Sequence, residues 1–137
     1  MNLQEYFPYK LASTAEGFSR RLVDVYGKTF GLSREEWRLL LLLADAGELT
    51  SLELSKRTTL DRVQVSRAAA KLENKGLIAR AMPASDRRLR KYSCTVEGQS
   101  LFDKAFPEVE ACSNAILSYL SPEERKALET GLSALEA

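Results

Sequence analysis

The first apolar residues of the chain recur every three or four positions, which is the spacing of an amphipathic helix. They are Leu11, Ala15, Phe18, Leu22 and Val25. We place this helix over roughly residues 8–30. A second helix should begin at Ser33, because Glu36 completes a capping box with it. Its apolar run over residues 39–43 indicates a helix that is buried on several sides.

Two short helices are predicted next. Thr50 with Glu53, and Asp61 with Gln64, give two further N-terminal caps, and the second of these helices should stop at Gly76. Two short helices joined by a turn form a helix-turn-helix. The buried face of the second helix is expected to contain Val65, Ala68 or Ala69, and Leu72.

The pattern changes from helix to strand after Gly76. Residues 77–80 and 89–95 are typical of two strands, and the turn-forming residues 83–86 between them predict a β-hairpin. Thr95 can cap the helix that follows, which Pro107 should bend or divide. The segment Ser121-Pro122-Glu123-Glu124 is a strong start for the last helix.

These elements predict a mainly α-helical fold with a small β-hairpin wing, in one compact domain of 137 residues. The winged helix-turn-helix would span 32–95, flanked by helices in 1–31 and 96–137. A winged helix does not need the apolar stripes at both chain ends in order to fold. We therefore expect the flanking helices to form a homodimer, with packing inside the monomer as the alternative.

Composition removes several classes of function. The chain contains no histidine, the usual general base of serine and cysteine hydrolases and a common zinc ligand. Cys94 and Cys112 are separated by 17 residues and lack the C-x-x-C spacing of zinc and dithiol sites. We expect no enzyme activity, metal or cofactor, and each cysteine is interpreted as a buried structural thiol.

No membrane segment is expected. The longest apolar run, Leu39 to Ala44, is far shorter than the ~20 residues that cross a bilayer, and the N-terminal residues lack the basic flank and apolar core of a signal peptide. We therefore expect a cytoplasmic protein.

The net charge of +1 conceals a strong segregation of charge. Residues 50–91 contain 11 Lys and Arg against 4 acids, a net +7, while the remainder of the chain carries −6. A basic middle between acidic ends favours a polyanion-binding surface. Chance clustering of solvated charges is the alternative.

The exposed face of the second helix of the helix-turn-helix has the side chains that read DNA. Arginine pairs with guanine and glutamine with adenine, and a valine can contact a thymine methyl group. Small residues let such a helix lie close to the groove. The residues expected on this face are Arg62, Val63, Gln64, Ser66, Arg67, Ala70 and Lys71. A merely solvated face is the alternative, but it leaves the basic hairpin unexplained.

The hairpin carries Asp86, Arg87, Arg88, Arg90 and Lys91. Basic side chains at its tip would reach the DNA backbone or a narrow minor groove, whose negative potential favours arginine. Asp86 is unusual there, and its carboxylate can accept from turn amides or hold the guanidinium group of Arg88. A charged edge that blocks strand aggregation is the alternative.

At this point the sequence resembles the MarR (multiple antibiotic resistance regulator) family of winged-helix transcription factors, over nearly the whole chain. The motifs that carry the resemblance are Leu32-Ser33 with Glu36-Trp37, Val65-Ser66-Arg67, the segment L-E-N-K-G-L-I-A-R at 72–80, Asp86-Arg87-Arg88, Cys94-Thr95-x-x-Gly98 and Leu120-Ser121-Pro122-Glu123-Glu124. The family usually has leucine where Cys94 stands and a hydroxylic residue near Val63 or Gln64.

The resemblance implies a sequence-specific transcriptional regulator, most often a repressor, that binds a pseudo-palindromic operator on double-stranded DNA as a homodimer. Arg88 would enter the minor groove with Asp86 orienting it, and the first helix and the last two would form the dimer. Phosphate contacts are assigned to Ser51, Thr59 and Lys75.

The resemblance also implies release by a small aromatic or anionic effector. The crevice for such an effector would be lined by Tyr9, Phe18, Tyr26 and Trp37. Aromatic residues on buried helix faces are more often core, which is the alternative here. Two other functions remain open at this point: a winged-helix module that binds an acidic protein, and a redox sensor that acts through Cys94 or Cys112.

Overall fold

The computed structural model describes residues 1–81 and 89–136. A short 3-10 turn, η1, precedes the first helix. The helices are α1 (Phe7–Lys28), α2 (Arg34–Ala46), α3 (Ser51–Arg57), α4 (Arg62–Asn74), α5 (Val96–Leu117) and α6 (Pro122–Glu136), and η1 covers Leu3–Glu5. The strands are β1 (Glu48–Thr50), β2 (Ile78–Arg80) and β3 (Lys91–Cys94). A mainly α-helical winged helix-turn-helix is therefore confirmed.

The starts of α2 to α6 lie where the sequence predicts them, because each is fixed by a local cap. Helix α1 has no side-chain cap and begins beside Pro8. Ser33 and Thr50 form capping boxes with Glu36 and Glu53. Thr95 caps α5 by accepting from the N–H of Gly98. Pro107 lies inside α5 without dividing it. The alternative that this proline divides the helix is therefore wrong.

The wing belongs to a three-stranded antiparallel sheet in the order β1-β3-β2. The predicted strands appear as β2 and β3, with Ile78 opposite Cys94. The sequence analysis missed β1, in which Leu49 pairs with Tyr92. This strand has three residues and no alternation long enough to detect, and it exists because β3 supplies its hydrogen bonds.

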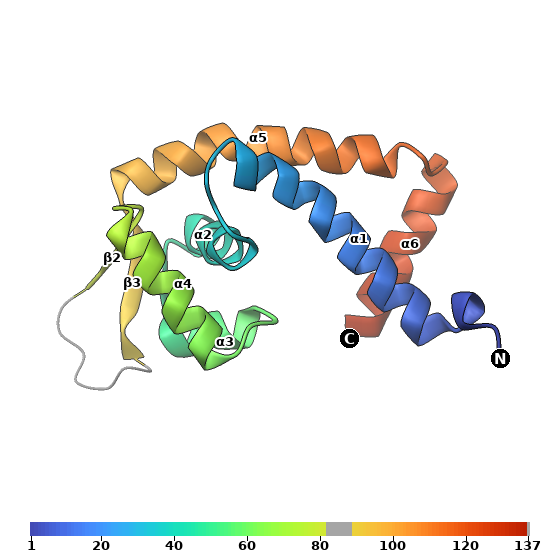
Figure 1. Cartoon of the computed structure of the whole chain (residues 1–137), viewed down its shortest axis with the longest axis horizontal. Coiled ribbons are helices and arrows are strands. Elements are labelled where there is room, and N and C mark those ends of the chain that lie inside the picture. Colours follow the sequence, from blue (N-terminus) through green and yellow to red (C-terminus); the bar gives the residue numbers. More distant parts are fainter. Residues whose placement is uncertain (82–88, 137) are drawn as a thin grey trace.

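Helix α2 lies at the centre of the fold and packs against α4, α5 and the sheet (Figure 1). Leu39, Leu40 and Leu43 of this helix are buried, as the apolar run predicts. Trp37 stacks between Tyr26 of α1 and Phe102 of α5, with ring centroids 5.2 Å and 5.6 Å away. The aromatic stack therefore joins the winged helix to the flanking helices.

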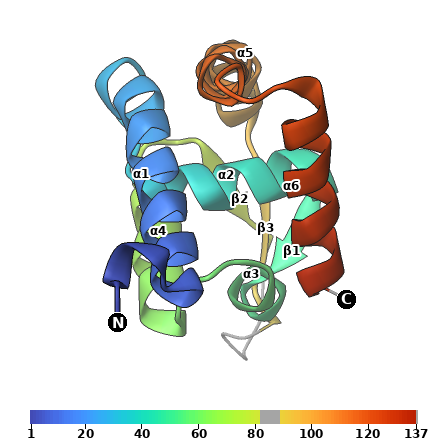
Figure 2. The same ribbon diagram turned by 90° about the vertical axis from the view of Figure 1, so that its right-hand side faces the viewer.

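The long helix α5 forms one edge of the molecule, and α1 packs beside it (Figure 1). The winged helix lies at one end of α5, and α6 descends from the other. Figure 2 shows α1 and α6 on either side of α5. Within residues 1–81 and 89–136, none of the helices combines the length and the apolar character needed to span a lipid bilayer.

Candidate nucleic-acid interface

Helix α4 has one buried and one exposed face, as the sequence predicts. Val65, Ala68, Ala69 and Leu72 are buried against the core. All seven residues predicted for the DNA-facing side are exposed: Arg62, Val63, Gln64, Ser66, Arg67, Ala70 and Lys71. An exposed helix face of this composition can enter a DNA major groove and contact base edges.

The N-terminus of α4 is held by a capping box between Asp61 and Gln64. The Gln64 N–H donates to Asp61 Oδ1 at 2.8 Å, and the Asp61 N–H donates to Gln64 Oε1 at 3.0 Å. The side-chain oxygen of Gln64 therefore already accepts a hydrogen bond, and its assignment to adenine readout stays a prediction. Val63 beside it is 56% exposed, and its apolar side chain has no hydrogen bond to give up on binding DNA.

A groove of about 480 Å³ separates α4 from α3 and β3. It is lined by Ser51, Leu52, Ser55, Arg62, Val63, Val65, Ser66, Arg67, Arg90 and Tyr92. Three of these side chains are arginines and none is acidic. The groove is therefore electropositive, with serine hydroxyls available as hydrogen-bond donors to phosphate.

The two segments that border this groove are joined through the backbone. Ser51, the first residue of α3, donates its N–H to the carbonyl oxygen of Arg90 at 2.9 Å. This bond extends the pairing of β1 with β3 by one step, and Arg90 lines the same groove as Arg62 and Arg67. Asp86, Arg87 and Arg88, the remaining predicted wing residues, lie outside the described residues.

Thr59 precedes α4, in the turn of the helix-turn-helix. Its hydroxyl oxygen accepts from Arg38 Nη1 of α2 at 2.9 Å. Its predicted phosphate contact and this internal bond are compatible, because a hydroxyl group both accepts and donates. Arg38 therefore fixes the Thr59 hydroxyl in the turn before α4, and its phosphate contact stays a prediction.

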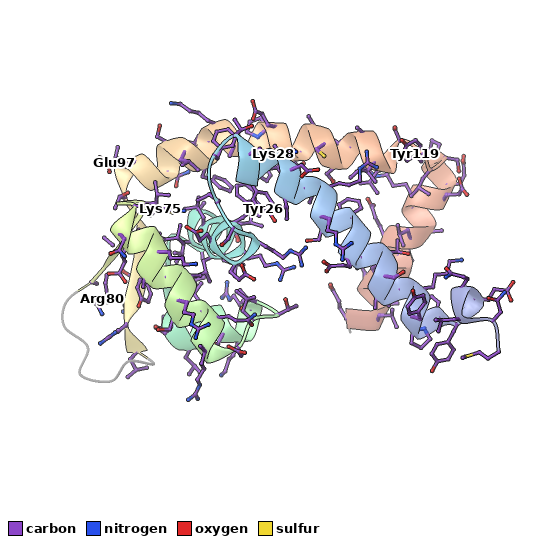
Figure 3. The ribbon with its side chains drawn as sticks, in the orientation of Figure 1. Tyr26, Lys28, Lys75, Arg80, Glu97 and Tyr119 are labelled. Atoms are coloured by element: carbon purple, nitrogen blue, oxygen red, sulfur yellow. The ribbon has the colours of Figure 1, made fainter. Side chains whose placement is uncertain are left out.

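Lys75, the third predicted phosphate contact, is engaged inside the protein. Its Nζ lies 2.6 Å from Glu36 Oε2 and 2.8 Å from the carbonyl oxygen of Gly31. Figure 3 shows Lys75 where the end of α4 meets α2. The sequence analysis missed Glu36 as its partner, because nothing in the local pattern at either position signals a contact across 39 residues.

Ser55 is a groove residue that the sequence analysis also missed. It follows Ser51 by four residues, so both lie on one face of α3, and both line the groove. The four-residue spacing from Ser51, just after the capping box at Thr50, could have indicated that Ser55 lies on the same face.

The four aromatic residues assigned to an effector crevice occupy different environments. Tyr26 and Trp37 are buried, and their stacked rings are nearly parallel, at 9°. Phe18 is half-buried, and Tyr9 is exposed near the start of α1. Tyr26 and Trp37 therefore serve the core in this structure, and an effector role for the four stays a prediction.

Both cysteines carry free thiols. Burial raises the pKa of the Cys94 thiol, and Asp103 adds to the increase. Cys112 Sγ donates to the carbonyl oxygen of Arg21 at 3.8 Å. A reactive sensor thiol needs a lowered pKa, so Cys94 does not have the properties of one.

Comparison with known proteins identifies similar chains. A family model described as "MarR family" matches residues 30–89. A Bacillus subtilis protein named an uncharacterized HTH-type transcriptional regulator, YdgJ, is 31% identical over 98 residues, which are 72% of this chain and 60% of that protein. The chain thus spans about three-fifths of that relative's length.

Two further proteins are similar over more of their length. The homoprotocatechuate degradative operon repressor of Escherichia coli is 27% identical over 101 residues, 74% of this chain and 68% of that protein. The second is the structure of Bordetella bronchiseptica BpsR, whose title describes regulation of its DNA binding by 6-hydroxynicotinic acid. The alignment covers 99% of this chain and 96% of the BpsR chain. Its TM-score is 0.85 at 20% identity, a likeness of fold.

Proposed function

We propose that this chain, whose residues 30–89 match the MarR family model, is a sequence-specific DNA-binding transcriptional regulator of that family that acts as a repressor. The observation that carries the proposal is the exposed face of α4 beside an electropositive groove, whose lining among the described residues includes three arginines and no acid. The winged helix-turn-helix of residues 32–95 would supply the DNA contacts. The repressor role is supported by the name of the Escherichia coli relative.

In the proposed complex, α4 enters the major groove. Arg62 and Arg67 are positioned to pair with guanine, and Val63 to contact a thymine methyl group. Ser66 is small enough to keep the helix close to the bases, and Lys71 lies about one turn beyond Arg67. Arg90, and with it Asp86, Arg87 and Arg88 of the wing, would follow the backbone and the adjacent minor groove.

The proposed regulator is a homodimer. Helix α6 has no buried residue and makes only marginal contact with the other described elements. Leu128, Leu132 and Leu135 are exposed along it, and Phe7 and Leu11 are exposed at the start of α1. A helix of 15 residues is marginal in water by itself, so a second copy that covers these faces explains why α6 forms.

The experiment that tests the proposed function is selection of bound fragments from genomic DNA, followed by titration of one selected duplex at several salt concentrations. We expect a pseudo-palindromic site with half-site centres ~34–36 Å apart. We also expect the affinity to fall steeply with salt, as phosphate contacts release counterions. Binding to an acidic protein, but to no duplex, would favour the protein-interaction alternative.

We extend the proposal to release by a small aromatic or anionic effector. The support is the Bordetella bronchiseptica protein, whose title names an aromatic acid as the regulator of DNA binding. In this chain Phe18 and Tyr9 are the accessible members of the assigned set, because Tyr26 and Trp37 are stacked in the core. A lower affinity for the selected duplex in the presence of 6-hydroxynicotinic acid supports this extension, and unchanged affinity contradicts it for that compound.

A further inference from the structure

We infer that Lys75 and Glu36 form a positioning pair for DNA binding, in which the Lys75 ammonium group holds the end of the recognition helix α4 instead of contacting a phosphate. This inference rests on the proposed function of α4. It replaces the assignment of Lys75 to the DNA backbone with a role inside the protein.

The environment of Glu36 makes the pair difficult to separate. The Glu36 side chain is 4% exposed, and the Lys75 side chain is 40% exposed. Glu36 Oε1 accepts from the N–H of Ser33 at 3.1 Å, and Oε2 accepts from Lys75 Nζ at 2.6 Å. If the ammonium group moved to a phosphate, a buried carboxylate would lose its counter-charge, which is strongly unfavourable. Lys75 is therefore more stable where it is.

The pair lies at a joint of the fold. Lys75 is the C-terminal cap of α4, and its Nζ also donates to the carbonyl oxygen of Gly31 in the connection between α1 and α2. On its other side, the carbonyl oxygen of Gly76 accepts from Thr95 Oγ1, the cap of α5, at 2.6 Å. The end of α4 is thus fixed to α2, to the connection between α1 and α2, and to the cap of α5.

Helix α2 holds α4 near both of its ends. Glu36 binds Lys75 at the C-terminal end, while Arg38 binds Thr59 in the turn before the N-terminal end. The direction in which α4 presents Arg62 and Arg67 is therefore set by these two polar contacts from α2 together with the packing of its buried face against the core. Removing the charge at Glu36 loosens one of these contacts without touching the DNA-facing side of α4.

The test variant is Glu36→Gln. Glutamine at this position retains the capping box with Ser33, so the change removes the charge and leaves the helix start in place. Simple electrostatics predicts tighter DNA binding, because a negative charge is lost. The positioning role predicts the opposite sign, a loss of at least about fivefold in affinity, in the range of coupling between residues in contact.

The measurement is a titration of one selected duplex at several salt concentrations, with protein concentrations corrected for the active fraction. Lys75→Met should lose affinity like Glu36→Gln, with an unchanged salt slope, and the double variant should lose no more than the weaker-binding single variant. Lys75→Arg should restore part of the affinity, because guanidinium can donate to both acceptors. Lys71→Met, on the exposed face of α4, is the matched control. Loss of a phosphate contact at Lys71 would make the fall of log affinity with log salt concentration shallower by about 0.9.

Two results would overturn the inference. One is a salt slope lowered by about 0.9 in Lys75→Met, and the other is unchanged or tighter binding by Glu36→Gln. If the unaltered protein binds no duplex, the proposed function fails, and hydrogen exchange tests the pair separately. Backbone amides at 72–76 should then exchange faster in Glu36→Gln than in the unaltered protein, and equal rates would show that the pair does not hold α4.

Discussion

Gly98 of α5 lies directly against the carbonyl group of Leu77, so that a Cβ atom at position 98 would overlap the Leu77 carbonyl oxygen. The same oxygen accepts from the N–H of Thr95 at 3.1 Å. The first turn of α5 is therefore packed backbone to backbone against the residue that leads into β2. Only glycine lets the wing and the long helix approach this closely.

Gly98→Ala should destabilise the protein by about 1–3 kcal/mol or more, because the overlapping atom belongs to the backbone and cannot rotate away. Urea unfolding of the variant and the unaltered protein measures the difference. Gly17→Ala in α1 is the control. Beyond the neighbouring backbone of α1, none of the described residues comes within 4 Å of the added methyl group there, and alanine is the better helix former. Equal stability of Gly98→Ala and the unaltered protein would show that the two segments separate easily.

Arg67→Ala should cost about 1–3 kcal/mol in DNA binding and reduce the discrimination between the selected site and altered sites. The guanidinium group lies on the exposed face of α4 and also lines the groove, so its loss should leave the fold intact. Competition binding with single-base variants of the site measures both effects. An equal loss of affinity for every duplex would mean that Arg67 contacts only the backbone.

Leu132→Lys should convert the protein to a monomer and weaken DNA binding, because it places a charge in the middle of the proposed interface of α6. Light scattering at micromolar concentration gives the mass directly. Thr130→Lys, an exposed position about half a helical turn away, is the control and should leave the dimer intact. A monomer in the unaltered protein at the same concentration contradicts the proposed homodimer.

The Glu36 carboxyl group should make the stability of the protein depend on pH. Burial alone would raise its pKa, but hydrogen bonds from Lys75 and Ser33 outweigh burial, and the pKa lies below its ordinary value of 4.5. A lowered pKa in the folded state gives stability that is complete above the unfolded pKa and is lost as pH falls toward the folded one.

Glu36→Gln should therefore be less stable than the unaltered protein at neutral pH, by about 1.5–3 kcal/mol, the range for a hydrogen bond to a charged group. The difference between the two proteins should shrink as pH falls below 4.5, because the unaltered protein then loses the contribution of the carboxylate. Urea unfolding at a series of pH values measures it. A difference that does not change with pH would mean that the charge of Glu36 contributes nothing.

The parts of the fold that could be predicted from sequence are those fixed by residues close together in the chain. The capping box of Thr50 with Glu53 is complete within four residues, and α3 begins where it indicates. Strand β1 just before it was missed, because its three residues become a strand only by pairing with Lys91 and its neighbours, some forty positions later.

The same distinction applies to the candidate site. The exposed side of α4 follows from helical spacing, so Arg62 and Arg67 lie where they were expected. The same spacing predicts the cap of Asp61 with Gln64, which engages the Gln64 side-chain oxygen, but it does not reveal that Lys75 is bound to Glu36. The DNA contacts assigned to Gln64 and Lys75 depend on whether the side chain already binds a polar partner within the protein. For Lys75 that partner, Glu36, comes from a distant part of the chain.

The stacking of Trp37 between Tyr26 and Phe102 gives this protein an optical property. Trp37 is the single tryptophan of the chain, is 6% exposed, and has an aromatic ring from α1 and another from α5 within 6 Å of it. The tryptophan fluorescence of the whole molecule therefore arises from the junction of three helices, at the short wavelengths of an indole shielded from water. Any ligand that alters how these helices meet would change the emission of one fluorophore, without a label.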